Sequence, residues 1–145
     1  MGVCGAVGWC ASALQLDQPG RDTHMRSIHT HIVHCSDSDF GDASIIRLWH
    51  QARGFRDVGY HFIVRRDGEI ELGRTIDEVG AHCRGHNGES IGTCLIGRDS
   101  FTRAQFDALR RIDAMLRRLF PGIQARPHNA FNAHKTCPNF DVQDV

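Results

Sequence analysis

Hydrophobic and polar residues alternate over five short stretches of the chain, and a period of two predicts β-strands. The expected strands cover residues 28–35, 60–66, 69–72, 90–96 and 123–127. Asp67-Gly68 stands between the second and third stretches and is typical of a tight hairpin turn. The second and third strands are therefore expected to pair antiparallel, which makes the sheet mixed.

Two longer stretches have the spacing of amphipathic helices. The first begins at Asp42 or Ser44, which can cap it, and runs to about Arg53. The second begins with the capping-box pattern Thr102-x-x-Gln105 and ends at Pro121-Gly122. Its apolar residues recur every three or four positions, at Phe106, Leu109, Ile112, Leu116 and Leu119. Helices alternating with strands in one short chain predict a single α/β domain, with a central mixed β-sheet flanked by helices.

The first 26 residues are expected to form an N-terminal extension, with the folded domain over 27–145. Met1–Ala13 has no positively charged segment and glycines interrupt its apolar part, so we do not expect a secretory signal. Ala6 stands where the myristoylation pattern requires Ser or Thr. Synthesis in a reducing cytosol, with most cysteines free, is the expectation. A bond between Cys4 and Cys10 remains an alternative.

Composition narrows the possible partners. The 145 residues include 17 Lys plus Arg and 17 Asp plus Glu, so the formal net charge is zero. This balance argues against a polycationic nucleic-acid binder and against charge-driven membrane anchoring. No apolar run reaches the roughly 20 residues of a membrane-spanning helix. The arginines of the second helix are expected to form a solvated face.

Ten histidines and six cysteines provide candidate zinc ligands. Three groupings compete, and spacing alone does not choose between them. On the first strand, alternation places His34 on the opposite face from His29 and His31. His34 also ends that strand, and sites in open α/β sheets form beyond the carboxyl ends of strands. The other groupings are His82-Cys83-x-x-His86 and the polar tail with His128, His134 and Cys137.

Four blocks of sequence identify a family resemblance over residues 28–142. They are IVHCSDS (32–38), RLWHQARGFRDVGYHFIVRRDGEIELGR (47–74), VGAHCRGHNGESIGTCLIG (79–97) and HKTCPNFDV (134–142). Together they resemble the zinc-dependent N-acetylmuramoyl-L-alanine amidases of type 2. This family includes phage lysozyme-amidases and peptidoglycan recognition proteins.

The resemblance implies a role for seven residues. His34, His128 and Cys137 match zinc ligands, and Tyr60 and Lys135 match catalytic residues. His82 and Asn87 match residues that bind the muramyl peptide. The implied reaction is hydrolysis of the amide between N-acetylmuramic acid and L-alanine, with Zn²⁺ as cofactor and residues 27–145 as the catalytic domain.

The biology implied by the resemblance is bacterial cell-wall lysis by a phage or prophage endolysin. Such an enzyme is made without a signal peptide in the host cytoplasm and acts on periplasmic peptidoglycan after release. We expect a monomer that neither binds nucleic acid nor inserts into a membrane. The alternatives are a non-catalytic peptidoglycan-binding module and a thiol hydrolase with Cys137 as nucleophile.

The sequence lacks one catalytic carboxylate found in part of the family, and the roles of two histidines stay open. In some bacterial relatives, a glutamate in the strand that corresponds to residues 91–97 acts as the general base. This chain has no carboxylate in that strand. The mechanism should therefore depend on Tyr60 and Lys135. We expect a structural role for His61, and leave His50 and His86 open. Cys35, Cys83 and Cys94 are expected to be small buried residues rather than ligands.

Overall fold

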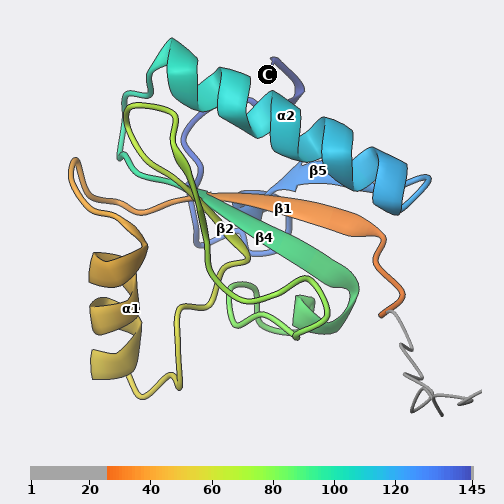
Figure 1. The fold of residues 1–145 in the computed structure, drawn as a ribbon, viewed down its shortest axis with the longest axis horizontal. Coiled ribbons are helices and arrows are strands. Elements are labelled where there is room, and N and C mark those ends of the chain that lie inside the picture. The colour runs from red at the N-terminus through yellow and green to blue at the C-terminus, as the bar shows by residue number, and fades with distance from the viewer. Residues whose placement is uncertain (1–25, 145) are drawn as a thin grey trace, which may run out of the picture.

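The computed structural model describes residues 26–144. They fold into a five-stranded sheet with one α-helix on each face (Figure 1). The expectations for residues 1–25, including the Cys4–Cys10 alternative, lie outside the described residues. The elements are β1 (Thr30–Cys35), α1 (Ala43–Ala52), β2 (Phe62–Val64), β3 (Ile70–Leu72), β4 (Ser90–Leu95), α2 (Arg103–Leu119) and β5 (Gln124–Pro127). Short 3-10 turns cover 87–89, 128–130 and 142–144.

The sheet is mixed, as the hairpin signal predicts. Its strand order is β3-β2-β4-β1-β5, with β4 in the centre. All neighbouring pairs are parallel except β2 and β3, which the turn at Asp67-Gly68 joins antiparallel. Gly68 takes φ +84°, a conformation that L side chains rarely adopt. Because β2, β4, β1 and β5 run the same way, their carboxyl ends meet at one edge of the sheet.

Helix α1 begins and ends within one residue of its predicted limits. The Asp42 carboxylate accepts the Ile45 N–H at 2.9 Å and caps the helix. A second carboxylate, from Glu71 on β3, accepts the Ala43 N–H at 2.6 Å and ties the helix start to the sheet. Ile46 packs with Ile63 and other buried residues on this face of the sheet.

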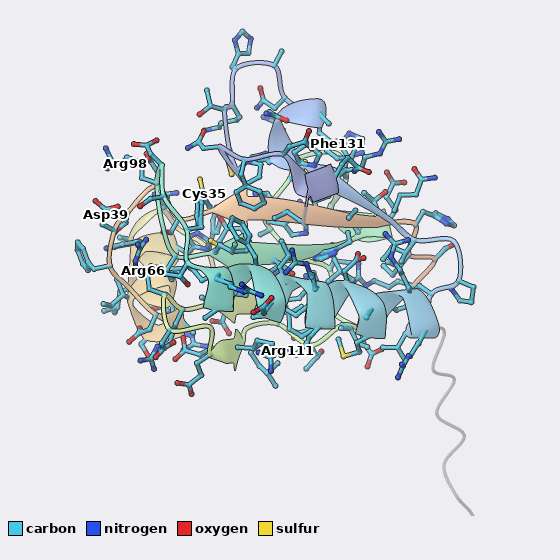
Figure 2. The ribbon with its side chains drawn as sticks, turned by 90° about the horizontal axis from the view of Figure 1, so that it is seen from above. Cys35, Asp39, Arg66, Arg98, Arg111 and Phe131 are labelled. Atoms are coloured by element: carbon cyan, nitrogen blue, oxygen red, sulfur yellow. The ribbon has the colours of Figure 1, made fainter. Side chains whose placement is uncertain are left out.

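Helix α2 covers the opposite face of the sheet (Figure 1). Thr102 and Gln105 form the predicted capping box. The Thr102 hydroxyl also donates to the Arg66 carbonyl at 2.7 Å, which links the helix start to the β2–β3 turn. The predicted apolar stripe packs on the sheet through three buried residues, Leu109, Ile112 and Leu116. Arg111 projects away from the sheet edge that carries Cys35 (Figure 2).

The two faces of β1 carry different chemistry, as the alternation predicts. His31 is fully buried on the α2 face, where Nδ1 lies 3.2 Å from the Asp113 carboxylate and Nε2 lies 2.8 Å from the Thr93 hydroxyl. His34 is almost fully buried on the other face. Its neighbours there are aromatic rings from three other segments of the chain, those of Tyr60, His82 and His128.

The folded region includes one residue of the expected extension. The Arg26 guanidinium donates to the carbonyls of Ile76, Asn87, Gly88 and Ser90, and it also lies 3.3 Å from His61 Nε2. Arg26 thus connects the start of the described chain to the loops before β4. Within the described residues, no helix is both long and apolar enough to cross a bilayer.

Candidate active site

Three metal-binding side chains converge at the carboxyl edge of the sheet. His34 lies near the end of β1, His128 directly follows β5, and Cys137 comes from the C-terminal loop. One ligand atom of each side chain lies within 4.8 Å of the other two. Because β1 and β5 are parallel neighbours, residues 94 positions apart in sequence become adjacent in space. The three residues are those that the family resemblance implies as zinc ligands.

Backbone hydrogen bonds hold the cysteine in this cluster. The Cys35 N–H donates to Cys137 Sγ at 3.0 Å, and the Asn129 N–H donates to the Cys137 carbonyl at 3.0 Å. The Cys35 side chain and burial raise the pKa of Cys137, while the Cys35 N–H that donates to its sulfur favours the thiolate, which is the form that binds metals. Figure 2 shows Cys35 at the end of β1. The strand end therefore supports Cys137 as well as supplying His34.

Burial favours the neutral, metal-binding form of both imidazoles. Burial lowers the pKa of His34 well below its usual range, and the nearby His82 and His128 lower it further. The pKa of His128 is lowered by burial and then by the positive charge of Lys135. Two neutral imidazoles and one thiolate make a donor set that suits zinc, and three protein ligands leave one coordination position open.

Tyr60 and Lys135 lie beside this cluster, where the resemblance implies they should act. The Tyr60 ring is centred 5.1 Å from the His34 ring. Burial raises the pKa of Tyr60 well above its usual range, and the Cys94 and Cys137 sulfurs raise it further. The phenol therefore keeps its proton as a hydrogen-bond donor. Lys135 is exposed on the loop that precedes Cys137.

The cluster opens into a cavity of about 450 Å³. Among its lining residues are Arg53, Phe55 and Asn139, to which the sequence assigned no role. Arg53 and Phe55 flank Gly54, which follows the end of α1. Their place at a helix end is the only sequence signal that could have predicted that they line the site. His50 lines it too, but its Nδ1 accepts the Gly59 N–H at 2.8 Å. The remaining lining residues are Ser36, Asp37, Ala81, His134 and Thr136, together with the residues of the cluster and its neighbours.

The two predicted substrate-binding residues have partners within the protein. His82 lines the cavity, but its Nδ1 lies 3.0 Å from His34 Nε2. The Asn87 side-chain oxygen accepts the backbone N–H groups of His82 and Cys83 at 2.9 and 2.8 Å. Asn87 does not line the cavity. Contact of either residue with substrate stays a prediction.

His61, His86 and three of the cysteines have structural environments, whereas His29 and His134 are exposed. Buried His61 accepts the Gly92 N–H through Nδ1 at 3.0 Å, in agreement with its expected structural role. His86 lies 3.0 Å from the Glu89 carboxylate and packs on Phe131. Cys35, Cys83 and Cys94 are buried free thiols, as expected. Cys35 nevertheless also lines the cavity, beside Cys137.

Comparison with known proteins agrees with this geometry. The family model described as N-acetylmuramoyl-L-alanine amidase matches residues 24–140. The endolysin of Klebsiella phage KP32 is 42% identical over 123 residues, which covers 77% of this chain and 80% of that protein. The endolysin of Escherichia phage T7 is 41% identical over 122 residues, with the same coverage.

Solved structures show the same architecture. The N-acetylmuramoyl-L-alanine amidase LysC from Clostridium intestinale superposes with a TM-score of 0.77 at 25% identity, covering 81% of this chain and 82% of that one. Bumblebee PGRP-SA, at 22% identity and a TM-score of 0.72, shares the fold. These matches confirm the predicted fold class and the resemblance. By sequence and by structure, the chain belongs to the N-acetylmuramoyl-L-alanine amidase family.

Proposed function

We propose that His34, His128 and Cys137 hold a zinc ion with which this amidase hydrolyses the bond between N-acetylmuramic acid and L-alanine in peptidoglycan. One observation carries the proposal: the three ligand atoms lie within 4.8 Å of one another, in a chain of this family. Two neutral nitrogens and one sulfur are the ligand types that zinc prefers. The backbone N–H at Cys137 Sγ further suits a thiolate ligand.

Zinc would supply the reactivity that side chains lack. A bound zinc ion with an open position lowers the pKa of water toward about 7 and polarises a carbonyl. The cavity supplies room for the scissile amide beside the cluster. Amide hydrolysis further needs groups that stabilise negative charge on the carbonyl oxygen and protonate the leaving amine.

Tyr60 and Lys135 are the residues that we assign to these tasks. The protonated phenol of Tyr60, beside His34, can donate a hydrogen bond to the carbonyl oxygen as it gains negative charge. The Lys135 ammonium lines the same cavity and favours the same charge. β4 has the sequence SIGTCL and offers no carboxylate as a base. We assign delivery of the amine proton to Tyr60, Lys135 or water.

The proposed biological role is lysis of the bacterial wall by a phage or prophage endolysin. The relatives from Klebsiella phage KP32 and Escherichia phage T7 are endolysins, and this chain covers 80% of each. We propose that the enzyme is made in the host cytoplasm and reaches the periplasmic peptidoglycan after release. We also propose that residues 27–145, with Arg26 as an anchor, form a monomeric catalytic domain.

Zinc stoichiometry tests the proposed centre. Purified enzyme should contain about one zinc per chain, and His128→Ala and Cys137→Ser should lose both the zinc and the amidase activity. His29→Ala is the matched control, because His29 is exposed and does not line the cavity. The control should keep its zinc and its activity. A Cys137→Ser variant with a full complement of zinc would refute the ligand assignment.

Chelation separates zinc hydrolysis from the two alternatives. A thiol hydrolase that uses Cys137 as nucleophile would remain active after complete zinc removal. The zinc enzyme should lose activity when zinc is removed and regain it when zinc is restored. A binding module would bind muramyl peptides without turnover whether or not zinc is present. Recovery of activity with added zinc excludes both alternatives.

A further inference from the structure

We infer that His82 is a positioning residue, which fixes the tautomer and the ring orientation of His34 so that His34 Nδ1 faces the metal. This inference rests on the proposed zinc site. The primary contact is the 3.0 Å distance between His82 Nδ1 and His34 Nε2. One of these nitrogens must carry the proton, and the surrounding hydrogen bonds determine which one it is.

Ser90, at the start of β4, fixes the tautomer of His82. Its hydroxyl donates its single proton to the His86 carbonyl at 2.6 Å. The Ser90 oxygen is then an acceptor toward His82 Nε2, which lies 3.4 Å away. His82 therefore carries its proton on Nε2 and presents a lone pair at Nδ1.

The tautomer of His82 in turn fixes that of His34. Because His82 Nδ1 is an acceptor, His34 must carry its proton on Nε2 and donate it to His82. His34 Nδ1 is then unprotonated, with its lone pair directed away from His82. A histidine that binds a metal through one ring nitrogen commonly donates its other N–H to such an acceptor, which orients the ring and raises its basicity.

Two glycines form a slot that holds the His82 ring. A Cβ at Gly92 would lie 2.6 Å from Cγ and Cδ2 of His82, and a Cβ at Gly80 would lie 2.5 Å from His82 Cδ2. Neither position admits a larger residue without displacing the imidazole. The His61 ring closes the slot, with its centroid 5.7 Å from that of His82. The packing thus restricts the ring independently of its hydrogen bonds.

The backbone of His82 is fixed as well. Asn87 accepts the N–H groups of His82 and Cys83, so its side chain shapes the loop that carries His82. The hydrogen bonds and the packing contacts of His82 order its imidazole before any substrate is present. Both residues that the resemblance assigns to substrate thereby acquire a role that needs no substrate.

Zinc affinity measured without substrate tests this inference. His82→Phe keeps a ring in the slot but removes the acceptor. It should weaken zinc binding by roughly 10- to 100-fold in competition with a chelator. His82→Asn is the conservative variant, because its Oδ1 can accept from His34 near the position of Nδ1. It should restore affinity to within about threefold of wild type, as expected if the acceptor matters.

Histidine-selective NMR of the zinc-loaded wild-type enzyme provides a readout that does not depend on the folding of a variant. The expected spectrum has His34 and His82 both protonated at Nε2. A zinc-bound His34 with its proton on Nδ1 would overturn the inference. So would a folded His82→Phe enzyme that binds zinc as tightly as wild type and changes only in KM, which would assign His82 to substrate. If wild type binds no zinc, the proposed metal site fails, and this inference fails with it.

Discussion

At the scale of single residues, two of the proposed ligands depend on partners that are distant in sequence. Cys137 accepts a hydrogen bond from the end of β1, and His34 contacts His82 from the loop before β4. Tyr60 lies against His34 without a bond to any of the proposed ligands. The ligands and the proposed catalytic groups are therefore separable by mutation.

Tyr60→Phe and Lys135→Ala should lower turnover while zinc is retained. Each variant removes one group that can stabilise negative charge on the carbonyl oxygen, so a loss of roughly 10²-fold in kcat is expected for each. Zinc content and kcat should be measured on the same samples. Arg111→Ala is the matched control for loss of a positive charge, since Arg111 lies on α2 and does not line the cavity. Unchanged kcat in both variants would show that the assignment of these two residues is wrong.

Sequence alone narrowed the candidate site but could not complete it. Spacing left three groupings of histidine and cysteine open, because the ligands come from β1, from the residue after β5 and from the C-terminal loop. The family resemblance selected three of these residues, and the fold brings the same three together. The role inferred for His82 could not be predicted, because it depends on the proton of Ser90 and on the space beside Gly92.

At the scale of elements, the local patterns predicted the helices and the order of the strands along the chain. The Asp42 cap and the Thr102–Gln105 capping box act over three residues, so sequence reveals them directly. The second strand is shorter than predicted, spanning Phe62–Val64 within the expected 60–66. Pairing continues irregularly on either side, as where the His61 N–H donates to the Gly92 carbonyl, and periodicity cannot show this.

The attachment of α2 to β1 predicts how stability depends on pH. The hydrogen bond from His31 and the pairing with Arg117 lower the pKa of Asp113 below its usual range. Folding thus favours the charged carboxylate, so its contribution is complete above the unfolded-state pKa, which is about 4, and is lost as pH falls through the folded-state pKa.

Asp113→Asn should therefore lower the free energy of unfolding by about 1–2 kcal/mol at pH 6. Urea denaturation at a series of pH values should show wild type and variant converging as the pH falls below about 4. Because the comparison is a difference between two proteins, acid effects elsewhere in the chain largely cancel. A gap that stays constant from pH 6 to pH 3 would contradict this account of the carboxylate.

At the scale of the whole molecule, parallel strands assemble one edge of the sheet into the site, and α2 covers the opposite face. The formal net charge is zero. Arginines of α2 pair with carboxylates of the same helix, Arg110 with Asp107 and Arg117 with Asp113. This pairing fits the expected solvated face. The substrate should consequently be recognised by the shape of the cavity rather than by long-range attraction.

Activity on purified peptidoglycan should therefore depend only modestly on ionic strength. Without a net charge to steer association, kcat/KM should change by less than about threefold between 50 and 300 mM salt. The rate of release of stem peptides at several salt concentrations measures this directly. A steep decline over this range would indicate a charged surface that guides the enzyme to the wall.

The most direct test of the central claim is mass spectrometry of bacterial sacculi digested with the purified enzyme. Hydrolysis of the bond between N-acetylmuramic acid and L-alanine predicts intact stem peptides with a free L-alanine amine, together with glycan strands that are not shortened. Chelated enzyme should release neither product. Sugar fragments, or stem peptides cut at an internal bond, would contradict the account.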